Sequence, residues 1–262
     1  MMYKTQQFLV FVVTAILSVL FVVDAVAQVG VFTKEDLIAY TSLWQGKRFP
    51  DGRPKVSDEI LERMKEVPID DAMDYIRSEH GHENQFEGGI WYRSHDNPIM
   101  VGRAVTAYYM PIRPDVDAVN KERYKNIVKG GGYISPIVNT LVDGDVVVVD
   151  MFGKIENGPV AGESVGLEMR KRGCRGLIVN GGGHDATGIR RKIKGFNSIC
   201  RGWTATHQKG VMLMGLNTPI NLGSVTVLPG DVVLTGIEGI LIIPSHLAEG
   251  VVNYYDEISK KM

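Results

Sequence analysis

Residues 158–185 place the start of a helix where it could hold a small anion. Gly162 and Glu163 stand at the first positions of a short predicted helix. The first turn of a helix leaves its backbone N–H groups without intrahelical partners, so those of Ser164 and Val165 could bind an anion. This arrangement predicts an anion site at residues 162–165.

A buried strand and a glycine loop follow this helix. The apolar run that begins at Gly176 predicts the strand, and the loop brings His184 and Asp185 to its carboxyl end, where open α/β sheets bind their ligands. Asp185 follows three glycines, so its carboxylate could approach a hard cation such as Mg²⁺. The alternative is a turn in which Asp185 bonds to its own backbone. An anion site that faces a metal-binding carboxylate suits a 2-oxo acid and favours an enzyme.

The same segment resembles the RraA-like family, which includes the 4-hydroxy-4-methyl-2-oxoglutarate (HMG) aldolases that also decarboxylate oxaloacetate. The family pattern, a glycine followed after about twenty residues by Arg-Asp, is matched at Gly162 and Asp185 but not at His184. Further blocks that resemble the family are Gly102–Thr106, Gly144–Asp150, Pro229–Val233 and Glu238–Gly239. The resemblance runs in family order from Val67 to Ser259 and indicates a divergent member with a long N-terminal extension.

The resemblance implies a divalent-metal-dependent lyase that acts on a short 2-oxo acid. In this interpretation Asp185 binds the metal, Mg²⁺ or alternatively Mn²⁺, which stabilises the enolate formed by retro-aldol cleavage or decarboxylation. His184 and Asp185 would be catalytic, and backbone N–H groups would orient the substrate carboxylate. The residues assigned to substrate binding are Gly162, Glu163, Ser164, Val165 and His184.

The resemblance also implies a fold and an assembly. The expected class is α/β, with a swivelling β/β/α domain built on a mixed sheet. Residues 99–262 would form this domain, and a helical and loop extension, residues 28–98, would precede it and merge into its core. RraA-like domains assemble into trimers, so we expect a homotrimer or a hexamer with pockets at subunit boundaries.

Three positions depart from the family pattern. His184 stands where the aldolases have an arginine, Gly188 where they have a second acid, and Asn180 where they often have an aspartate. A neighbouring dication disfavours a protonated imidazole, so His184 would be a neutral hydrogen-bond donor, a metal ligand or a proton shuttle, unless it is a loop residue without a role. Two other functions stay open: a non-catalytic RraA-like protein that binds a small molecule or a protein, and a lyase on a sugar-derived acid with His184 as the base.

The composition is that of one substantial globular domain. The chain has 262 residues, of which 44% are hydrophobic and 23% are charged. The net charge of −1 and the scattered basic residues do not indicate binding of nucleic acid. The short basic run at Arg190–Lys194 is typical of a solvated face.

The N-terminal residues have the pattern of a secretory signal peptide. Lys4 precedes a long apolar run, and Ala25 and Ala27 are small residues of the kind that a signal peptidase recognises. Cleavage before Gln28 would remove Met1–Ala27 and leave a periplasmic or secreted protein without stable membrane insertion. The alternative is an uncleaved anchor, although the apolar run is shorter than the ~20 residues that a bilayer span requires.

Periodicity and turn residues predict the remaining elements. Thr33, Ser57 and Asp70 are expected to cap helices of the extension. The predicted strands are Met100–Tyr109, Val146–Val149, Leu177–Val179, Val211–Leu213, Ser224–Val227, Val232–Leu234 and Ile240–Ile243. Helices are expected over Tyr133–Leu141, from the resemblance, and over His246–Lys260. The tight turn at Val227–Asp231 predicts that the two strands it joins are antiparallel.

The two cysteines could form a disulfide if the protein is exported. No feature of the sequence places Cys174 and Cys200 near each other, however, and both lie in apolar surroundings. We therefore interpret them as two small buried hydrophobic residues.

The remaining histidines are better explained as loop residues than as ligands. His80 and His82 stand beside Glu83 and could suggest a zinc site, but glycine between them indicates a polar loop and no second ligand cluster is placed by the sequence. The same interpretation applies to His207 and His246.

Overall fold

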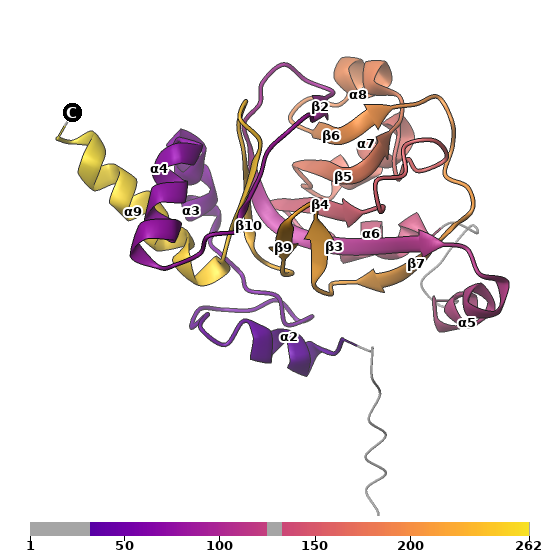
Figure 1. The fold of residues 1–262 in the computed structure, drawn as a ribbon, viewed down its shortest axis with the longest axis horizontal. Helices are drawn as coiled ribbons and strands as arrows, with labels where there is room; N and C mark the ends of the chain where they lie inside the picture. Colours follow the sequence, from indigo (N-terminus) through magenta and orange to yellow (C-terminus); the bar gives the residue numbers. More distant parts are fainter. Residues whose placement is uncertain (1–31, 125–132, 262) are drawn as a thin grey trace, which may run out of the picture. The chain divides into compact units, whose positions relative to one another are not determined.

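The structure, a computed structural model, describes residues 32–124 and 133–261, which form a mixed β-sheet with helices packed against it (Figure 1). The predicted α/β class is confirmed. The predicted signal peptide, Met1–Ala27, lies outside the described residues. Within the part of the chain that is described, no helix is long and apolar enough to cross a membrane.

The strands form one large sheet and one small one. Their bounds are β1 (Phe86–Glu87), β2 (Tyr92–Arg93), β3 (Met100–Pro111), β4 (Asp145–Asp150), β5 (Gly176–Gly183), β6 (Asn197–Trp203), β7 (Val211–Leu216), β8 (Ile220–Leu222), β9 (Val225–Val227), β10 (Val232–Thr235) and β11 (Ile240–Ile243). In the described residues the large sheet has the order β1-β11-β10-β3-β4-β5-β6-β2, and β7 also pairs with β3. The central strands β3 to β6 are parallel, whereas the outer pairings are antiparallel.

Helices cover both the ends and one face of this sheet. Their bounds are α2 (Lys34–Tyr40), α3 (Asp58–Arg63), α4 (Ile69–Asp74), α5 (Pro114–Tyr124), α6 (Ile134–Thr140), α7 (Glu163–Lys171), α8 (Ala186–Lys192) and α9 (Ala248–Ser259), with the single turns η1 (Met64–Glu66), η2 (Tyr75–Glu79) and η3 (Ser245–Leu247). Thr33 and Ser57 cap α2 and α3 as predicted. The prediction that Asp70 caps a helix is wrong, because the extended backbone of Pro68 already begins α4 and leaves Asp70 in its first turn.

The central strands are apolar on both faces, and each face has its own cover. Val147 and Val149 of β4 pack in one cluster with Met169 of α7 and Ile189 of α8. Val148, which points the other way, packs in a second cluster with residues of β8 and β9. Burial on both faces explains why β4 reads as an unbroken valine run instead of an alternating pattern.

A third cluster joins the extension to the sheet. Helices α3, α4 and α9 lie side by side at one end of the molecule (Figure 1) and pack on β10 and β11 through Leu61, Ala72, Leu234, Leu241 and Val251. Strands β1 and β2, which precede residue 99, pair with β11 and β6. Residues of the predicted extension therefore contribute directly to the sheet.

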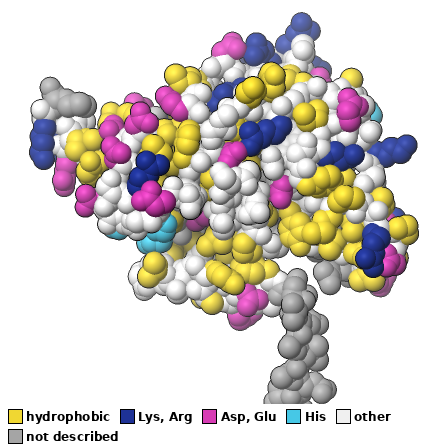
Figure 2. Space-filling view, in the orientation of Figure 1, with side chains coloured by type: hydrophobic (Ala, Val, Ile, Leu, Met, Phe, Trp, Pro, Cys, Tyr) yellow, Lys and Arg dark blue, Asp and Glu magenta, His cyan; other side chains and the backbone are white. Residues whose placement is uncertain are grey.

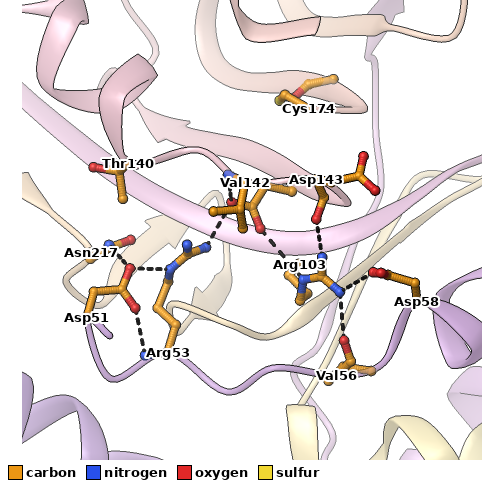
Figure 3. A network of polar contacts seen from close by, with 12 residues as sticks. Asp51, Arg53, Val56, Asp58, Arg103, Thr140, Val142, Asp143, Cys174 and Asn217 are labelled. Carbon is orange, nitrogen blue, oxygen red and sulfur yellow. Dashed lines mark hydrogen bonds and ion pairs between the residues drawn. The ribbon is translucent and has the colours of Figure 1, made fainter. Parts of the chain in front are cut away.

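Two buried arginines fasten the segment before α3 to the start of β4. Arg53 bonds to Asp51 at 2.7 Å, and Arg103 bonds to Asp58 at 2.8 Å and to the carbonyl of Val56 at 2.7 Å (Figure 3). Asp145, which is fully buried, lies 3.2 Å from Arg53 Nη1 and 3.7 Å from Arg103 Nε. We call Arg53, Arg103, Asp58 and Asp145 the ion cluster.

The glycines after Val179 do not form the predicted flexible loop. They belong to β5, where Gly182 pairs with Gly202 and Gly183 with Trp203. A Cβ on Gly182 would lie 2.3 Å from the carbonyl oxygen of Ile155, and a Cβ on Gly183 would lie 2.5 Å from Trp203. Glycine is required here because neighbouring chain covers both positions, so this part of the prediction is wrong.

Two further predictions about strands need correction. Residues 197–203 and 220–222 form strands β6 and β8, which the sequence did not reveal because polar residues interrupt their apolar pattern. The turn at Val227–Asp231 does not join paired strands: β9 pairs with β8, and β10 pairs with β3 and β11. The Asp231 carboxylate accepts a bond from Leu228 N at 2.8 Å, which closes the turn as the chain passes between sheets.

Both cysteines are buried and free. Burial raises the pKa of the Cys174 and Cys200 thiols to about 12 in each case. The interpretation of the pair as small buried hydrophobic residues is confirmed.

Candidate functional site

The predicted anion site lies at the start of α7, which begins at Glu163. Gly162 precedes it with an extended backbone (φ −114°, ψ −159°) and supplies no side-chain cap. Its carbonyl accepts the first helical bond, from Gly166 N at 2.9 Å. The N–H groups of Glu163, Ser164 and Val165 therefore precede the hydrogen-bonded part of the helix and are available to an anion.

His184 lies against this helix start in a defined orientation. Its Nδ1 is 3.1 Å from the carbonyl oxygen of Thr204. Because a carbonyl only accepts, Nδ1 carries the hydrogen, and Nε2 of the neutral ring keeps its lone pair. A Cβ on Gly162 would lie 2.8 Å from His184 Cδ2, the carbon beside Nε2. The edge of the ring that can accept a proton or bind a metal thus faces the start of α7.

These residues open into a cavity of about 270 Å³. Its lining residues are Tyr133, Ile134, Pro159, Val160, Ala161, Gly162, Val165, His184, His207 and Gln208. The rings of His184 and His207 lie close together, with 4.8 Å between their centroids. The sequence predicts only a loop residue at His207. No local pattern places it near His184, because it follows β6, a strand that the sequence pattern does not predict.

Asp185 caps α8 and does not line this cavity. Its backbone is left-handed (φ 55°, ψ 47°), its side chain is exposed, and its Oδ1 accepts a bond from Gly188 N at 3.1 Å. This is the local backbone bond of the alternative interpretation. It occupies only part of the acceptor capacity of the carboxylate, so the carboxylate can also bind a ligand.

The carboxylates of Asp185 and Glu163 converge over Gly188. A Cβ on Gly188 would lie 2.5 and 2.7 Å from the two Asp185 oxygens and 2.7 Å from Glu163 Oε2. Glu163 also pairs with Lys192 at 2.7 Å. Two carboxylates with water ligands form the donor set that Mg²⁺ prefers, so these residues fit a divalent cation. Among the described residues no three His, Cys, Asp or Glu side chains are grouped to hold a metal.

The other histidines stand outside the cavity lining. His80 and His82 lie in a loop, as predicted, and the ring of His82 is 6.0 Å from that of His246. Burial lowers the pKa of His246, and the neighbouring His82 and His80 imidazoles lower it further. Three of the predicted site residues, Gly162, Val165 and His184, therefore line the cavity, whereas Ser164 and Asp185 are exposed and are not among its described lining residues.

The parallel core, the crossover helices and a small-molecule pocket beyond the end of β5 define an α/β protein with its candidate site at the carboxyl edge of the sheet. Residues 55–242 match the RraA-like family, described as Aldolase/RraA, and the chain belongs to this family. This confirms the resemblance found in the sequence.

Individual relatives are more distant. The chain is 32% identical over 108 residues to a protein of Halalkalibacterium halodurans named "Putative 4-hydroxy-4-methyl-2-oxoglutarate aldolase", and the match covers 41% of this chain and 50% of that protein. The chain thus spans about half the length of this relative.

Solved structures show the same fold. RraAS2 of Streptomyces coelicolor, described as an unusual member of the RNase ES inhibitor RraA protein family, has a TM-score of 0.63 and 21% identity, covering 79% of this chain and 99% of its own. A structure described under "novel cellulases from microbes associated with the gut ecosystem" has a TM-score of 0.67 and 20% identity, covering 87% and 94%. At these identities the likeness concerns the fold alone.

Proposed function

We propose that this protein is a divalent-metal-dependent lyase that acts on a short 2-oxo acid. The reaction would be retro-aldol cleavage of an HMG-type substrate, decarboxylation of oxaloacetate, or both, with pyruvate as product. The observation that carries the proposal is the convergence of the Asp185 and Glu163 carboxylates beside the uncapped start of α7. Membership of a family described as Aldolase/RraA supports it.

Asp185 would hold the metal, and Glu163 would lie beside it. The expected metal is Mg²⁺, with Mn²⁺ as the alternative. A bound divalent cation would supply Lewis-acid stabilisation of the negative charge that develops when the C–C bond breaks. The N–H groups of Ser164 and Val165 would hold the substrate carboxylate and fix its orientation. The chain itself would thus supply both the anion site, at the start of α7, and the cation ligands, Asp185 and Glu163.

His184 supports a second candidate, a lyase on a sugar-derived acid in which this residue is the base. The Thr204 carbonyl accepts a bond from Nδ1. In the neutral ring Nε2 can accept a proton or bind a metal but cannot donate, so of the three roles considered for His184 the neutral donor is the least compatible with this geometry.

The test is pyruvate release from HMG and from oxaloacetate with Mg²⁺ or Mn²⁺, with a protein-free metal control for spontaneous decarboxylation. Asp185→Ala should abolish both turnover and metal-dependent thermal stabilisation. Asp185→Asn is the matched variant, because asparagine caps a helix as well as aspartate does but lacks its charge. An Asp185→Ala protein that binds metal and turns over like the parent would remove the support for this mechanism.

His184→Arg separates the two candidate roles of the histidine. If His184 replaces the arginine of the aldolases, the substitution should keep metal binding and raise oxaloacetate decarboxylation, by tenfold for each ~1.4 kcal/mol recovered. If His184 is the base of a different reaction, the same variant should lose the native activity and keep the metal. His246→Arg, outside the cavity lining, is the control.

We also propose that the protein is a homotrimer or a hexamer with pockets at subunit boundaries. The proposal rests on the family to which the chain belongs. Light scattering at micromolar concentration should give a trimer or a multiple of it, and a monomer would contradict the proposal and the boundary pocket together.

A further proposal is that the mature chain is exported and begins at Gln28. It rests on Lys4 and on the small residues Ala25 and Ala27 around the apolar run. Intact-mass analysis of exported protein should give a chain that starts at Gln28, and retention of Met1 would contradict it.

A further inference from the structure

Part of the cavity lining is apolar. Ile134, Pro159, Val160 and Val165 make up this apolar wall, and Val160 is only 8% exposed. Because Val160 and Ala161 lead directly into Gly162, this wall adjoins the N–H groups at the start of α7. A ligand carboxylate bound to those groups would place the rest of the ligand against hydrocarbon.

The described part of the cavity offers one site for an anionic group, the start of α7. Its polar lining side chains are Tyr133, His184, His207 and Gln208, and no lysine or arginine is among the described lining residues. The Tyr133 hydroxyl is already bonded to Asp117. Lys192 is paired with Glu163 at 2.7 Å and is not among the described lining residues. Among the described lining residues a second carboxylate would therefore find no cationic partner, and burying a charge without a partner is costly.

We propose that the substrate is a 4-hydroxy-2-oxo acid that carries an apolar alkyl or aryl group on C4 instead of a second carboxylate. This inference rests on the proposed lyase function and names the substrate class of the same site. The C1 carboxylate binds at Ser164 and Val165, and the C4 substituent packs on Val160 and Ile134. The small size of the cavity, about 270 Å³, limits the substituent to a single ring or a short branched chain.

The reaction balances without an external oxidant or reductant. The C3–C4 bond breaks, and its electron pair stays on C3 as the enolate of pyruvate. The C4 hydroxyl gives its proton to a base, for which His184 Nε2 offers a lone pair, and C4 becomes the carbonyl carbon of an aldehyde or ketone. A proton then adds to C3, so the products are pyruvate and one apolar carbonyl compound.

The test compares two substrates of the same reaction with the full-length folded protein and Mg²⁺ or Mn²⁺. We expect kcat/KM for 4-hydroxy-2-oxo-4-phenylbutanoate to exceed that for HMG by about tenfold or more, which corresponds to ~1.4 kcal/mol. A preference for HMG would overturn this inference and leave the proposed lyase function standing. Pyruvate release from neither substrate would overturn the lyase function itself.

A variant pair tests the role of the lining directly. Gln208→Arg adds a cation from a half-buried position of the wall and should shift the ratio of the two kcat/KM values toward HMG by about tenfold. Gln208→Leu, which removes the amide without adding charge, should keep the preference for the apolar substrate. If the arginine variant is folded by circular dichroism and the ratio does not move, the assignment of the apolar wall to the C4 substituent is wrong.

Discussion

The two ends of the parallel strands hold aspartates in opposite environments. Asp145, at the start of β4, is fully buried and lies 3.2 Å from Arg53 and 3.7 Å from Arg103. Asp185, just beyond the end of β5, is exposed and accepts one backbone bond, from Gly188 N. The first carboxylate is enclosed by protein partners and serves the fold, whereas the second keeps acceptor capacity for a ligand.

The electrostatics follow the same division. Burial raises the pKa of Asp145, and the Arg53 and Arg103 guanidinium groups act against that rise. Phe49 lies under Arg53, 4.9 Å from ring centroid to guanidinium carbon, and helps to exclude water. Removing one member would leave a buried charge without its partner, which is the costly way to break such a cluster.

On the face shown in Figure 2, acidic and basic side chains of the described residues are interspersed. The ion cluster, in contrast, gathers its charges in the interior, and the candidate site offers backbone N–H groups, imidazoles and two carboxylates.

The largest expected effect on stability comes from removing the buried aspartate at the start of β4. Asp145→Ala should lower the free energy of unfolding by about 3–5 kcal/mol, because Arg53 and Arg103 would remain buried without their shared partner. Urea unfolding followed by circular dichroism measures it. A loss below about 1 kcal/mol would show that water or Asp51 replaces the carboxylate and that the two aspartates differ less than the structure indicates.

A second buried aspartate, Asp231, shows by comparison how the arginines affect the pKa of Asp145. No arginine of the described residues pairs with Asp231, and burial raises the pKa of this carboxyl group to about 7. Between the unfolded value of about 3.9 and about 7, the folded state binds more protons, so the free energy of unfolding should fall as the pH rises through this window, by on the order of 4 kcal/mol. Asp231→Asn should remove this dependence when urea unfolding is repeated from pH 4 to 8. An unchanged pH profile would contradict the assignment.

At the exposed end, Gly188→Ala should disturb the two carboxylates without straining the helix. The added Cβ would lie within 2.7 Å of oxygens of both Asp185 and Glu163, so both must move. We expect metal affinity to fall by about tenfold, or ~1.4 kcal/mol, by calorimetric titration. Gly81→Ala is a poor control because of its positive φ, whereas Ser164→Ala keeps the helix and leaves the carboxylates in place. Equal affinity in the Gly188→Ala and parent proteins would argue against a metal at this point.

The smallest expected effect on the free energy of unfolding is that of removing Asp185. Asp185→Ala should cost only about 1 kcal/mol of stability, the usual price of one helix cap, although it should abolish metal-dependent activity. The same urea experiment as for Asp145→Ala checks it. A loss as large as that of Asp145→Ala would mean that Asp185 also serves mainly the fold.

Local patterns were sufficient for the first half of the candidate site. The start of α7 at Glu163 and the placement of His184 and Asp185 after β5 follow from a glycine, a short amphipathic stretch and an apolar run, all within residues 158–185. Apolar runs also marked β3, β4, β10 and β11. Strand β6 was not predicted because Asn197, Ser198 and Arg201 interrupt its apolar pattern, although most of the strand is buried between its neighbours.

The sequence by itself determined the fold class, the family and the residues at the start of α7 and the end of β5. It could do so because helix capping, glycine placement and apolar periodicity act over a few residues. Only the tertiary structure decided which partners those residues meet. The approach of the His207 ring to that of His184 depends on the loop after β6, and the pairing of Arg53 with Asp145 joins residues 92 positions apart. Such contacts depend on the order of the strands in the sheet and on which segments cover each face of the sheet, and no local pattern encodes either.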